Sequence, residues 1–382
     1  MTAPTDLMKT TITVNVALGG VPVPRAGFGT VLIVSPACAP PGGALTRTYS
    51  SATATTQLAA DLTAAYISDD VKLAVETAFM QARRPATVKV GKCSTLAAPA
   101  TQLTLDMAAI LAADQDFYGV TLDLSVAGAP PAWTPLAVQA TIDANIIALA
   151  AWCETNDRLY CAMDYDVLVY AADGGACEDM KALAYENTAF VWSQMHGAAA
   201  PGTAYQWADV AALARWLAFD PDTYAAPFRA PLTGIVRAKT TAAFDDLTAA
   251  QIALAQGHNA NLALLFGSAA AFLDKGINVN GRDWQEVLSK HWLQARVRED
   301  LADVVVDRAS RGLPFPLSSE GVAICSAVIN RRLQQGVAVG RFSTTSVGSA
   351  VLDLANKRIT LSASATVLGS AREFVFNVDF LR

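Results

Sequence analysis

Short apolar strands alternate with helices between residues 29 and 266, and this alternation constrains the fold more than any other feature of the sequence. Residues 30–34 form a continuous apolar run that suits a buried strand, and residues 69–83 place apolar side chains at helical spacing. Strands separated by helices of this length form a mainly parallel or mixed sheet with flanking helices, the α/β class. The predicted strands are 30–34, 47–51, 86–90, 118–126, 158–163, 189–193 and 261–266, and the predicted helices are 69–83, 103–113, 136–153, 177–184, 205–218 and 243–256.

The sequence changes character after Gly276. Residues 283–306 carry an apolar stripe and a charged face, which predict a long amphipathic helix. A second helix is expected to begin after Ser318, a good N-cap, and to stop at Gly336. Together with a strand that follows, these elements predict a C-terminal α+β domain over residues 267–370.

Strands with strict alternation lie near both ends of the sequence. Residues 357–367 and 372–381 alternate apolar and polar side chains on either side of Gly369-Ser370, which predicts a β-hairpin over the last 25 residues. Residues 10–18 form a matching strand, and a linker rich in Gly and Pro separates it from the rest. The apolar faces of the two terminal strands are Ile12, Val14, Val16 and Leu18, and Phe374, Phe376, Val378 and Phe380.

Each terminal strand either completes a sheet in its own chain or adds to a sheet of a neighbouring copy. The first is the usual outcome for a terminal strand. We expect the second, with those eight residues at the subunit interface, because the composition points to a covered surface, the two terminal strands match, and the family resemblance described below implies it. Of the 382 residues, 53% are hydrophobic and only 16% are charged, whereas an average soluble protein has about 25% charged residues. A homo-oligomer supplies such cover. The predicted domains are an N-terminal arm (1–22), an α/β domain (23–266), the C-terminal α+β domain (267–370) and a C-terminal arm (371–382). The resemblance described below implies that the α/β domain is the outer one.

Other environments fit the sequence less well. The long uncharged stretches 26–46, 124–142 and 187–208 contain prolines or polar side chains, so we expect no membrane-spanning helix. The net charge is −6 and no run of Lys or Arg exceeds a pair, which disfavours nucleic acid as a partner. The first nine residues lack the pattern of a signal peptide. Six scattered cysteines without a CxxC pair predict reduced thiols rather than disulfides or a zinc site.

Candidate catalytic residues are few. No GxxxxGK[ST] phosphate loop is present, and His196, His258 and His291 have no second His or Cys at ligand spacing. Asp164 and Asp166 follow a predicted strand, at the end of the sheet where open α/β folds bind ligands, and two carboxylates there could hold a divalent metal. The competing interpretation is a polar loop in which an aspartate caps the next turn. It is favoured because no phosphate-binding loop accompanies the pair.

Several short motifs occur in a characteristic order from Arg25 onward. They are residues 25–30 (Arg-Ala-Gly-Phe-Gly-Thr), 158–164, 187–192, 207–220, 281–282 and 313–321, the last of which leads into the helix expected to stop at Gly336. In their order and spacing they resemble the contractile tail sheath proteins of bacteriophages. Pro316-Leu317 departs from the family, which often carries a Tyr-Thr pair before this helix cap. We expect the departure to affect only local packing.

The resemblance implies a structural subunit and no enzymatic activity. Sheath subunits assemble as a helical array of stacked rings around a tail tube, and their terminal arms add strands to the sheets of neighbours. Contraction converts an extended lattice into a shorter, wider one and drives the tube through the host envelope, without ATP. The implied partners are further copies of the chain, the tail tube protein, which the C-terminal domain faces, and baseplate and tail terminator proteins. The implied location is the virion tail, after assembly in the host cytoplasm.

The sequence therefore predicts a self-assembling tail sheath subunit, with no catalytic residue, no cofactor and no metal. The alternative from a different class is a cytoplasmic α/β metal-dependent transferase that uses Asp164 and Asp166. That alternative leaves the low charge and the two terminal strands unexplained.

Overall fold

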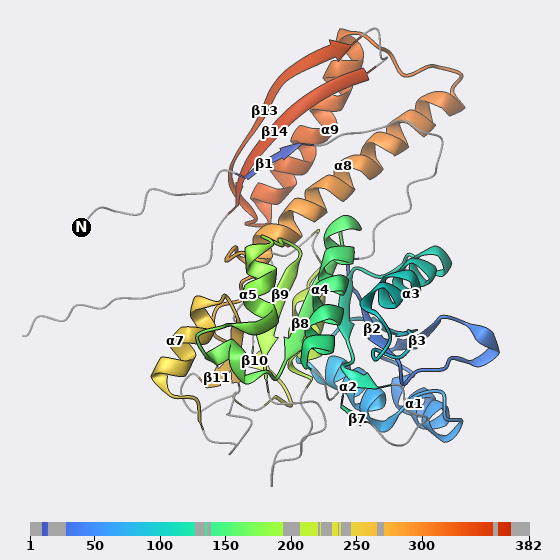
Figure 1. Ribbon diagram of the computed structural model, residues 1–382. Coiled ribbons are helices and arrows are strands. Elements are labelled where there is room, and N and C mark those ends of the chain that lie inside the picture. Colours follow the sequence, from blue (N-terminus) through green and yellow to red (C-terminus); the bar gives the residue numbers. More distant parts are fainter. Residues whose placement is uncertain are drawn as a thin grey trace, which may run out of the picture.

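The computed structural model of the chain describes residues 10–13, 28–126, 134–135, 139–193, 207–220, 222, 231–235, 237, 246–265, 271–353 and 358–367. The elements between residues 28 and 273 form an α/β body. The elements between residues 284 and 367, together with the N-terminal strand, form a C-terminal unit. Figure 1 shows the C-terminal unit standing on one side of the α/β body.

Nine strands of the described residues form one sheet through the α/β body. The central strands, in the order β11-β9-β8-β5-β2-β4, are parallel, and antiparallel strands flank them at both edges. From one edge to the other the strands are β10 (Pro231–Leu232), β12 (Ala271–Leu273), β11 (Asn261–Leu265), β9 (Thr188–Trp192), β8 (Leu159–Asp164), β5 (Gly119–Leu122), β2 (Thr30–Ser35), β4 (Thr87–Lys92) and β3 (Thr46–Ser50).

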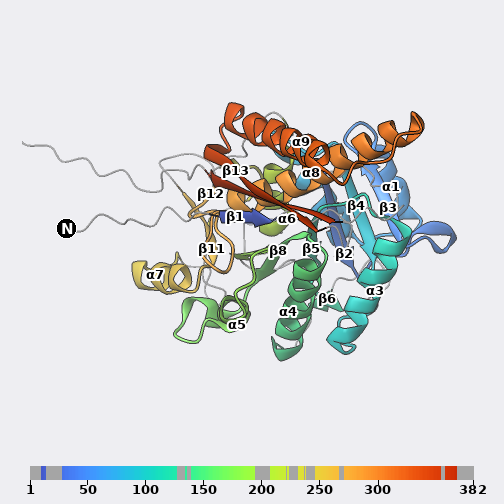
Figure 2. The ribbon, with the colours of Figure 1, turned by 90° about the horizontal axis from the view of Figure 1, so that it is seen from above.

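Helices cover both faces of this sheet because its strands are apolar on both sides. In β2, Val31 and Ile33 belong to one hydrophobic core, whereas Leu32 and Val34 belong to the other. Helices α2 and α6 pack on the first face. Helices α3, α4 and α5 line the second face (Figure 2). The helices are α1 (Ala54–Thr63), α2 (Asp69–Met80), α3 (Ala100–Ala113), α4 (Gln139–Thr155), α5 (Gly175–Ala182), α6 (Ala208–Leu217) and α7 (Ala249–Gly257), with short 3-10 turns η1 (Pro41–Gly43) and η2 (Val167–Tyr170) and a small strand pair, β6 (Ser125–Val126) and β7 (Thr134–Pro135).

Helix α6 links the body to the C-terminal unit. It packs closely on β5 because residue 119 is a glycine, where any Cβ would clash with the side chains of Leu213 and Leu217. From the same helix, the ring of Trp216 lies 4.8 Å from that of Trp284, at the start of the first helix of the C-terminal unit. Both indoles are buried. The two parts of the molecule therefore share one continuous core.

The C-terminal unit consists of a helix pair packed on a three-stranded antiparallel sheet. The sheet has the order β1-β14-β13, and α9 contacts both β13 and β14. On β14, Leu361, Ala363 and Ala365 are buried, while serines and threonines alternate with them, as the sequence predicts. The elements are β1 (Thr10–Thr13), α8 (Trp284–Ser310), α9 (Ser319–Ala338), β13 (Phe342–Asp353) and β14 (Arg358–Val367).

The predicted α/β class is confirmed. Every strand and helix predicted for the body occurs with shifted ends, and the predicted strand 118–126 is divided into β5 and β6. Helix α8 also occurs as predicted and runs four residues further, to Ser310. The prediction omits α1, β7, β10, β12 and β13.

The predicted end of the second C-terminal helix is wrong. Helix α9 continues through Gly336 to Ala338. It ends in a Schellman arrangement around Gly340, whose φ is +76°. The N–H of Arg341 donates to the carbonyl of Gly336 at 2.8 Å, and that of Gly340 to Val337 at 3.0 Å. Gly336 is instead a contact residue, because a Cβ there would clash with the buried ring of Phe342.

The described strands give β14 partners other than the hairpin that the sequence predicts. On one side β14 pairs with β13 from Phe342 to Asp353, and on the other with β1. The predicted last strand, residues 372–381, lies outside the described residues.

The structure also bears on membrane-spanning helices and on the cysteines. None of their helices is both long and apolar enough to cross a membrane. The six cysteines are all buried and free, as their scattered spacing predicts.

Candidate functional site

The predicted interface strands lie only partly within the described residues. Ile12 lies in β1, directly opposite Ala363 of β14 in the same chain. The structure thus places residues 10–13 of the N-terminal strand in a sheet of their own chain. The other predicted interface residues, Val14, Val16, Leu18, Phe374, Phe376, Val378 and Phe380, lie outside the described residues.

The C-terminal sheet has the short strand β1 at one edge and β13, which the sequence prediction missed, at the other. In the described part of the chain, β14 is the one strand that pairs with β13. Along its other edge, the N–H and C=O groups of this 12-residue strand therefore have no strand partner among the described residues. An open edge of this length is a template for one more strand.

Exposed apolar side chains gather at the end of the C-terminal unit that lies away from the body. This end contains the last turns of α8 and the end of β13 (Figure 1). Val306 and Val351 are 67% and 62% exposed, and Leu313 and Leu352 are also exposed. Exposed apolar side chains at this end of the unit are candidates for contact with another protein.

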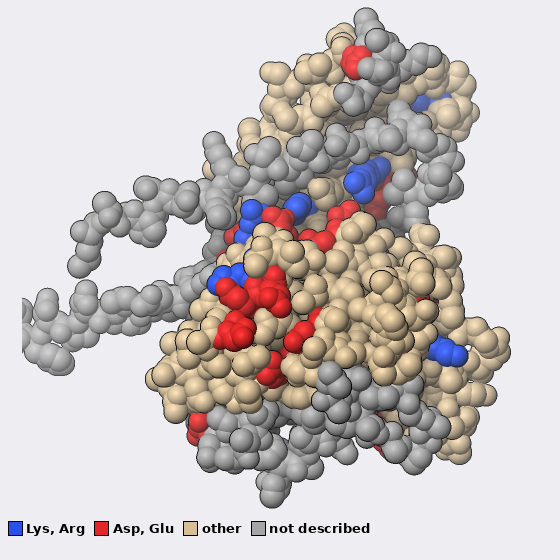
Figure 3. Space-filling view, viewed as in Figure 1, with Lys and Arg blue, Asp and Glu red and all other residues tan. Residues whose placement is uncertain are grey.

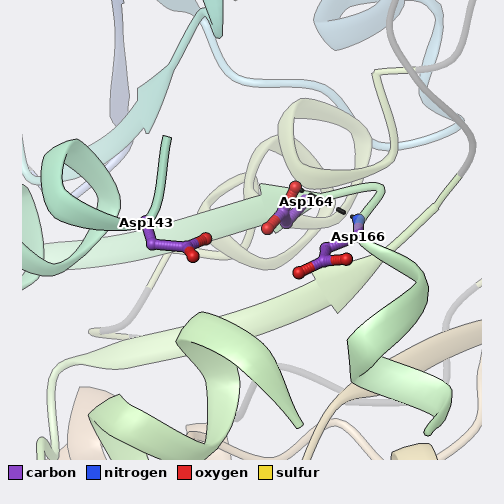
Figure 4. Close-up of side chains that lie close together, drawn as sticks. All are labelled: Asp143, Asp164 and Asp166. Atoms are coloured by element: carbon purple, nitrogen blue, oxygen red, sulfur yellow. Dashed lines mark hydrogen bonds between the residues drawn. The ribbon is translucent and has the colours of Figure 1, made fainter. Parts of the chain in front are cut away.

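Three aspartates from separate segments converge inside the body (Figure 4). Asp143 lies on α4, Asp164 is the last residue of β8, and Asp166 lies in the loop that follows. One carboxylate oxygen of each lies within 4.8 Å of the others. Asp164 is fully buried and Asp166 is 8% exposed, whereas Asp143 is partly exposed.

Hydrogen bonds hold these carboxylates in place. Asp164 Oδ1 accepts the N–H of Tyr165 at 2.7 Å, and Asp166 Oδ1 accepts the N–H of Leu168 at 3.0 Å as the N-cap of η2. Nε2 of Gln139 donates to both Asp143 and Asp164, at 2.8 Å each. The predicted capping role of an aspartate in this loop is therefore confirmed for Asp166.

The group is electrostatically costly as three anions. At an effective dielectric constant of about 20, two unit charges about 4.8 Å apart repel by roughly 3.5 kcal/mol. Burial, reinforced by the charges of Asp143 and Asp166, raises the pKa of Asp164 to about 7. Burial also raises the pKa of Asp143, to which Asp166, Asp179 and Asp173 contribute. A proton on Asp164 or a bound cation would relieve this repulsion.

The sequence identifies two members of this cluster and misses the third. Asp164 and Asp166 lie at the carboxyl end of a parallel strand, as predicted. Asp143 lies about 20 residues earlier, on a different element, and its position is set by the packing of α4 on β8. One local signal exists, since Gln139 and Asp143 are one helical turn apart and share a face.

The described histidines take part in hydrogen bonds to neighbouring groups. His258 contacts Glu178 Oε2 at 2.9 Å and the carbonyl of Ala171 at 3.0 Å. His291 of α8 contacts the Tyr118 hydroxyl, beside β5, through Nδ1 at 2.6 Å. Burial lowers the pKa of His291 to about 4. His196 lies outside the described residues.

Comparison with known proteins identifies the fold. No family model matches the sequence, and no curated protein matches it. A chain in the cryo-EM structure of the anti-feeding prophage baseplate aligns with 98% of this chain and 97% of its own length, with a TM-score of 0.63 and 11% sequence identity. The chain has the fold of that baseplate chain.

This likeness is consistent with the resemblance to the contractile tail sheath family. A sheath tail protein from Desulfitobacterium hafniense aligns with 93% of this chain and 100% of its own, at 12% identity and a TM-score of 0.48. The comparison with the baseplate chain does not favour the transferase alternative.

Proposed function

We propose that the chain is a structural subunit of a contractile tail sheath, or of a sheath-like ring in a related injection machine. The observation that carries this proposal is the fold shared with a chain of the anti-feeding prophage baseplate over 98% of the sequence. The low charge content, the open edge of β13 and the exposed apolar end of the C-terminal unit support it. Each of these is expected of a surface that further copies cover.

In this proposal the terminal arms, residues 1–22 and 371–382, exchange strands between neighbouring copies. The antiparallel pairing of β1 with β14 is the type of contact that can be exchanged, because the same register forms within one chain or between two. The apolar residues of both arms, from Ile12 to Leu18 and from Phe374 to Phe380, then set the register between subunits. The chain would act without catalytic residues or nucleotide.

In the proposed assembly, the two domains of each subunit face opposite sides of the array. Residues 23–266 form the outer domain of a helical array of stacked rings, and residues 267–370 face the tail tube. Baseplate and tail terminator proteins contact the two ends of the array. Contraction rotates the subunits as rigid bodies while the arm contacts persist, and drives the tube through the host envelope. The array assembles in the host cytoplasm and becomes part of the virion tail.

A single disulfide tests the exchange of the N-terminal strand. Ile12 and Ala363 are directly opposite in the register of β1 and β14, and opposed residues of antiparallel strands lie about 4.5–5.5 Å apart between Cα atoms, within the range for a disulfide. We expect the double variant Ile12→Cys and Ala363→Cys to form a ladder of covalent oligomers when assembled protein is oxidised. The native cysteines are buried and should give little background.

One result of this disulfide experiment would contradict the exchange of β1. A product that migrates only as an internally bridged monomer, from protein that electron microscopy shows to be assembled, would mean that β1 stays in its own chain. Ile12→Cys alone and Ala363→Cys alone are the matched controls, and neither should give a ladder.

Electron microscopy tests the larger proposal. We expect purified protein to form tubes or stacked rings, and a variant that lacks residues 372–382 to remain folded by circular dichroism without assembling. A monodisperse monomer at high concentration for the full chain would contradict the sheath assignment. Loss of folding on truncation would mean that the last strand pairs within its own chain.

A further inference from the structure

The cluster of Asp143, Asp164 and Asp166 brings three carboxylates together without a lysine or arginine partner among the described residues. Two other buried carboxylates do have cationic partners: Asp61 pairs with Arg47 at 2.8 Å, and Asp300 with Arg332 at 2.6 Å. Within the described residues, the three aspartates of the cluster form no ion pair. They approach one another although like charges repel.

One buried oxygen of the cluster has no hydrogen-bond partner among the described residues. It is Oδ2 of Asp166. Asp166 is 8% exposed. The N-terminal end of α5 lies close by, since a Cβ on Gly175 would be 3.2 Å from this oxygen. A buried carboxylate oxygen without a donor is costly unless a ligand occupies the space in front of it.

The charge around the cluster would attract a cation. Figure 3 shows acidic side chains gathered around α5, and the charges of Asp173 and Asp179 on this surface act on Asp143. Because Asp143 is partly exposed, the cluster is open to solvent on its side. A cation can therefore reach the two buried aspartates past Asp143.

The spacing of the oxygens identifies the class of ion. Ca²⁺ takes oxygen ligands at about 2.3–2.6 Å, so that two ligands on opposite sides of the ion are roughly 5 Å apart. The three aspartate oxygens, all within 4.8 Å of one another, fit around one such ion. The donor set contains no sulfur or imidazole, which argues against the softer transition metals.

We propose that Asp143, Asp164 and Asp166 bind one divalent cation that prefers oxygen ligands, with Ca²⁺ the best match in size. The ion would connect α4 with the end of β8 and with η2, and its role would be structural. Gln139, whose amide now bridges Asp143 and Asp164, offers a further oxygen ligand when its amide group is turned over. This inference goes beyond the assembly function and does not depend on it.

Terbium luminescence tests the proposal on the full-length chain, because Tb³⁺ replaces Ca²⁺ and is excited by nearby aromatic groups. The indole N–H of Trp192 donates to the carbonyl of Asp166 at 2.9 Å, and Tyr165 lies between two of the ligands. We expect saturable emission at one ion per chain, reversed by Ca²⁺. Asp166→Asn should weaken binding by at least about tenfold, since even changes beyond the direct ligands cost 10–100-fold in metal affinity.

Asp173→Asn is the matched control, because it removes one nearby exposed charge and leaves the three ligands intact. We expect it to change the affinity by less than about threefold, as for a screened surface charge. Emission that Ca²⁺ does not reverse, or equal weakening by both variants, would overturn the proposal and leave only a diffuse acidic surface. If circular dichroism shows that Asp166→Asn does not fold, the same criterion applies to Asp143→Asn, whose side chain is partly exposed.

Discussion

The two sheets of this protein are built on opposite plans. In the α/β body, every residue of β2 is buried, and alternate side chains enter two separate cores. In the C-terminal unit, β13 has one buried residue, Phe342, and most of its other residues are exposed. One sheet is covered on both faces by its own helices, and the other by α9 on one face.

The difference concerns what each part can do alone. A sheet that buries both faces and ends in antiparallel edge strands completes its own packing. A three-stranded sheet with a 12-residue, mostly exposed edge strand is suited to adding strands and neighbours. If the proposed assembly is correct, the body maintains the shape of the subunit while the C-terminal unit makes the lattice.

The largest expected effect contrasts the same substitution in the two sheets. Leu32→Ala in β2 removes a fully buried side chain and should lower the free energy of unfolding by about 2–5 kcal/mol. Leu352→Ala in β13, where the leucine is 39% exposed, should cost under about 1 kcal/mol in unassembled protein. Urea unfolding of both variants measures the contrast. Equal losses would mean that β13 is as well packed as the body.

The yield of assembled protein gives a second measurement on the Leu352→Ala variant. We expect Leu352→Ala to reduce the yield of tubes or rings while leaving the monomer stable, and this would place the function of that side chain between subunits. Assembly that is unaffected by Leu352→Ala would remove that residue from the interface.

The next largest expected effect is a pH dependence of stability that arises at the contact between the α/β body and the C-terminal unit. His291 of α8 is buried beside Tyr118, and burial lowers its pKa to about 4. In the unfolded chain the imidazole titrates near pH 6.5. The unfolded state therefore binds more protons between those values, and stability should fall by up to about 3 kcal/mol as the pH drops from 6.5 to 4. Unfolding measured across this range should show the loss in the wild type and not in His291→Gln.

Tyr118→Phe is the control for the hydrogen bond to His291. It removes that bond and leaves the imidazole buried, so it should lower stability and keep the pH dependence. Asp164 acts in the opposite sense, because its raised pKa of about 7 makes stability fall as the pH rises from about 4 to 7. The difference between wild type and His291→Gln at each pH isolates the histidine. An unchanged slope in His291→Gln would assign the acid sensitivity to another group.

The sequence predicts the body well because its signals are local. A continuous apolar run such as that of β2 indicates a buried strand, and Ser68 and the two aspartates after it indicate the start of α2, where Ser68 Oγ accepts the N–H of Val71. Strand β13 is missed because half of its residues are Ser, Thr or Gly and two register shifts interrupt its alternation. Its partner β14, which lacks such interruptions, is predicted.

The candidate sites show the same limit. Asp164 and Asp166 are adjacent to a predictable strand, so their position follows from the topology. The approach of Asp143 depends on how α4 packs, and the pairing of Ile12 with Ala363 joins the two ends of the described chain. Neither contact has a signal in local sequence. The role of Gly336 is misjudged for a related reason, since a glycine near a helix end indicates termination, whereas its contact with Phe342 is tertiary.

The smallest expected effect follows from that glycine. Gly336→Ala should gain about 1 kcal/mol of helix propensity, but its Cβ would clash with the ring of Phe342, which is 1% exposed and contacts Trp292. Overpacking costs about 1–3 kcal/mol, so the net change should be destabilising by about 1 kcal/mol. Gly257→Ala at the end of α7 is the matched control. No described atom lies within 4 Å of a Cβ there, so it should stabilise by about 0.4–1 kcal/mol. Opposite signs in urea unfolding would show that Gly336 serves packing in the C-terminal unit, whereas stabilisation by both variants would mean that the ring of Phe342 has room to move.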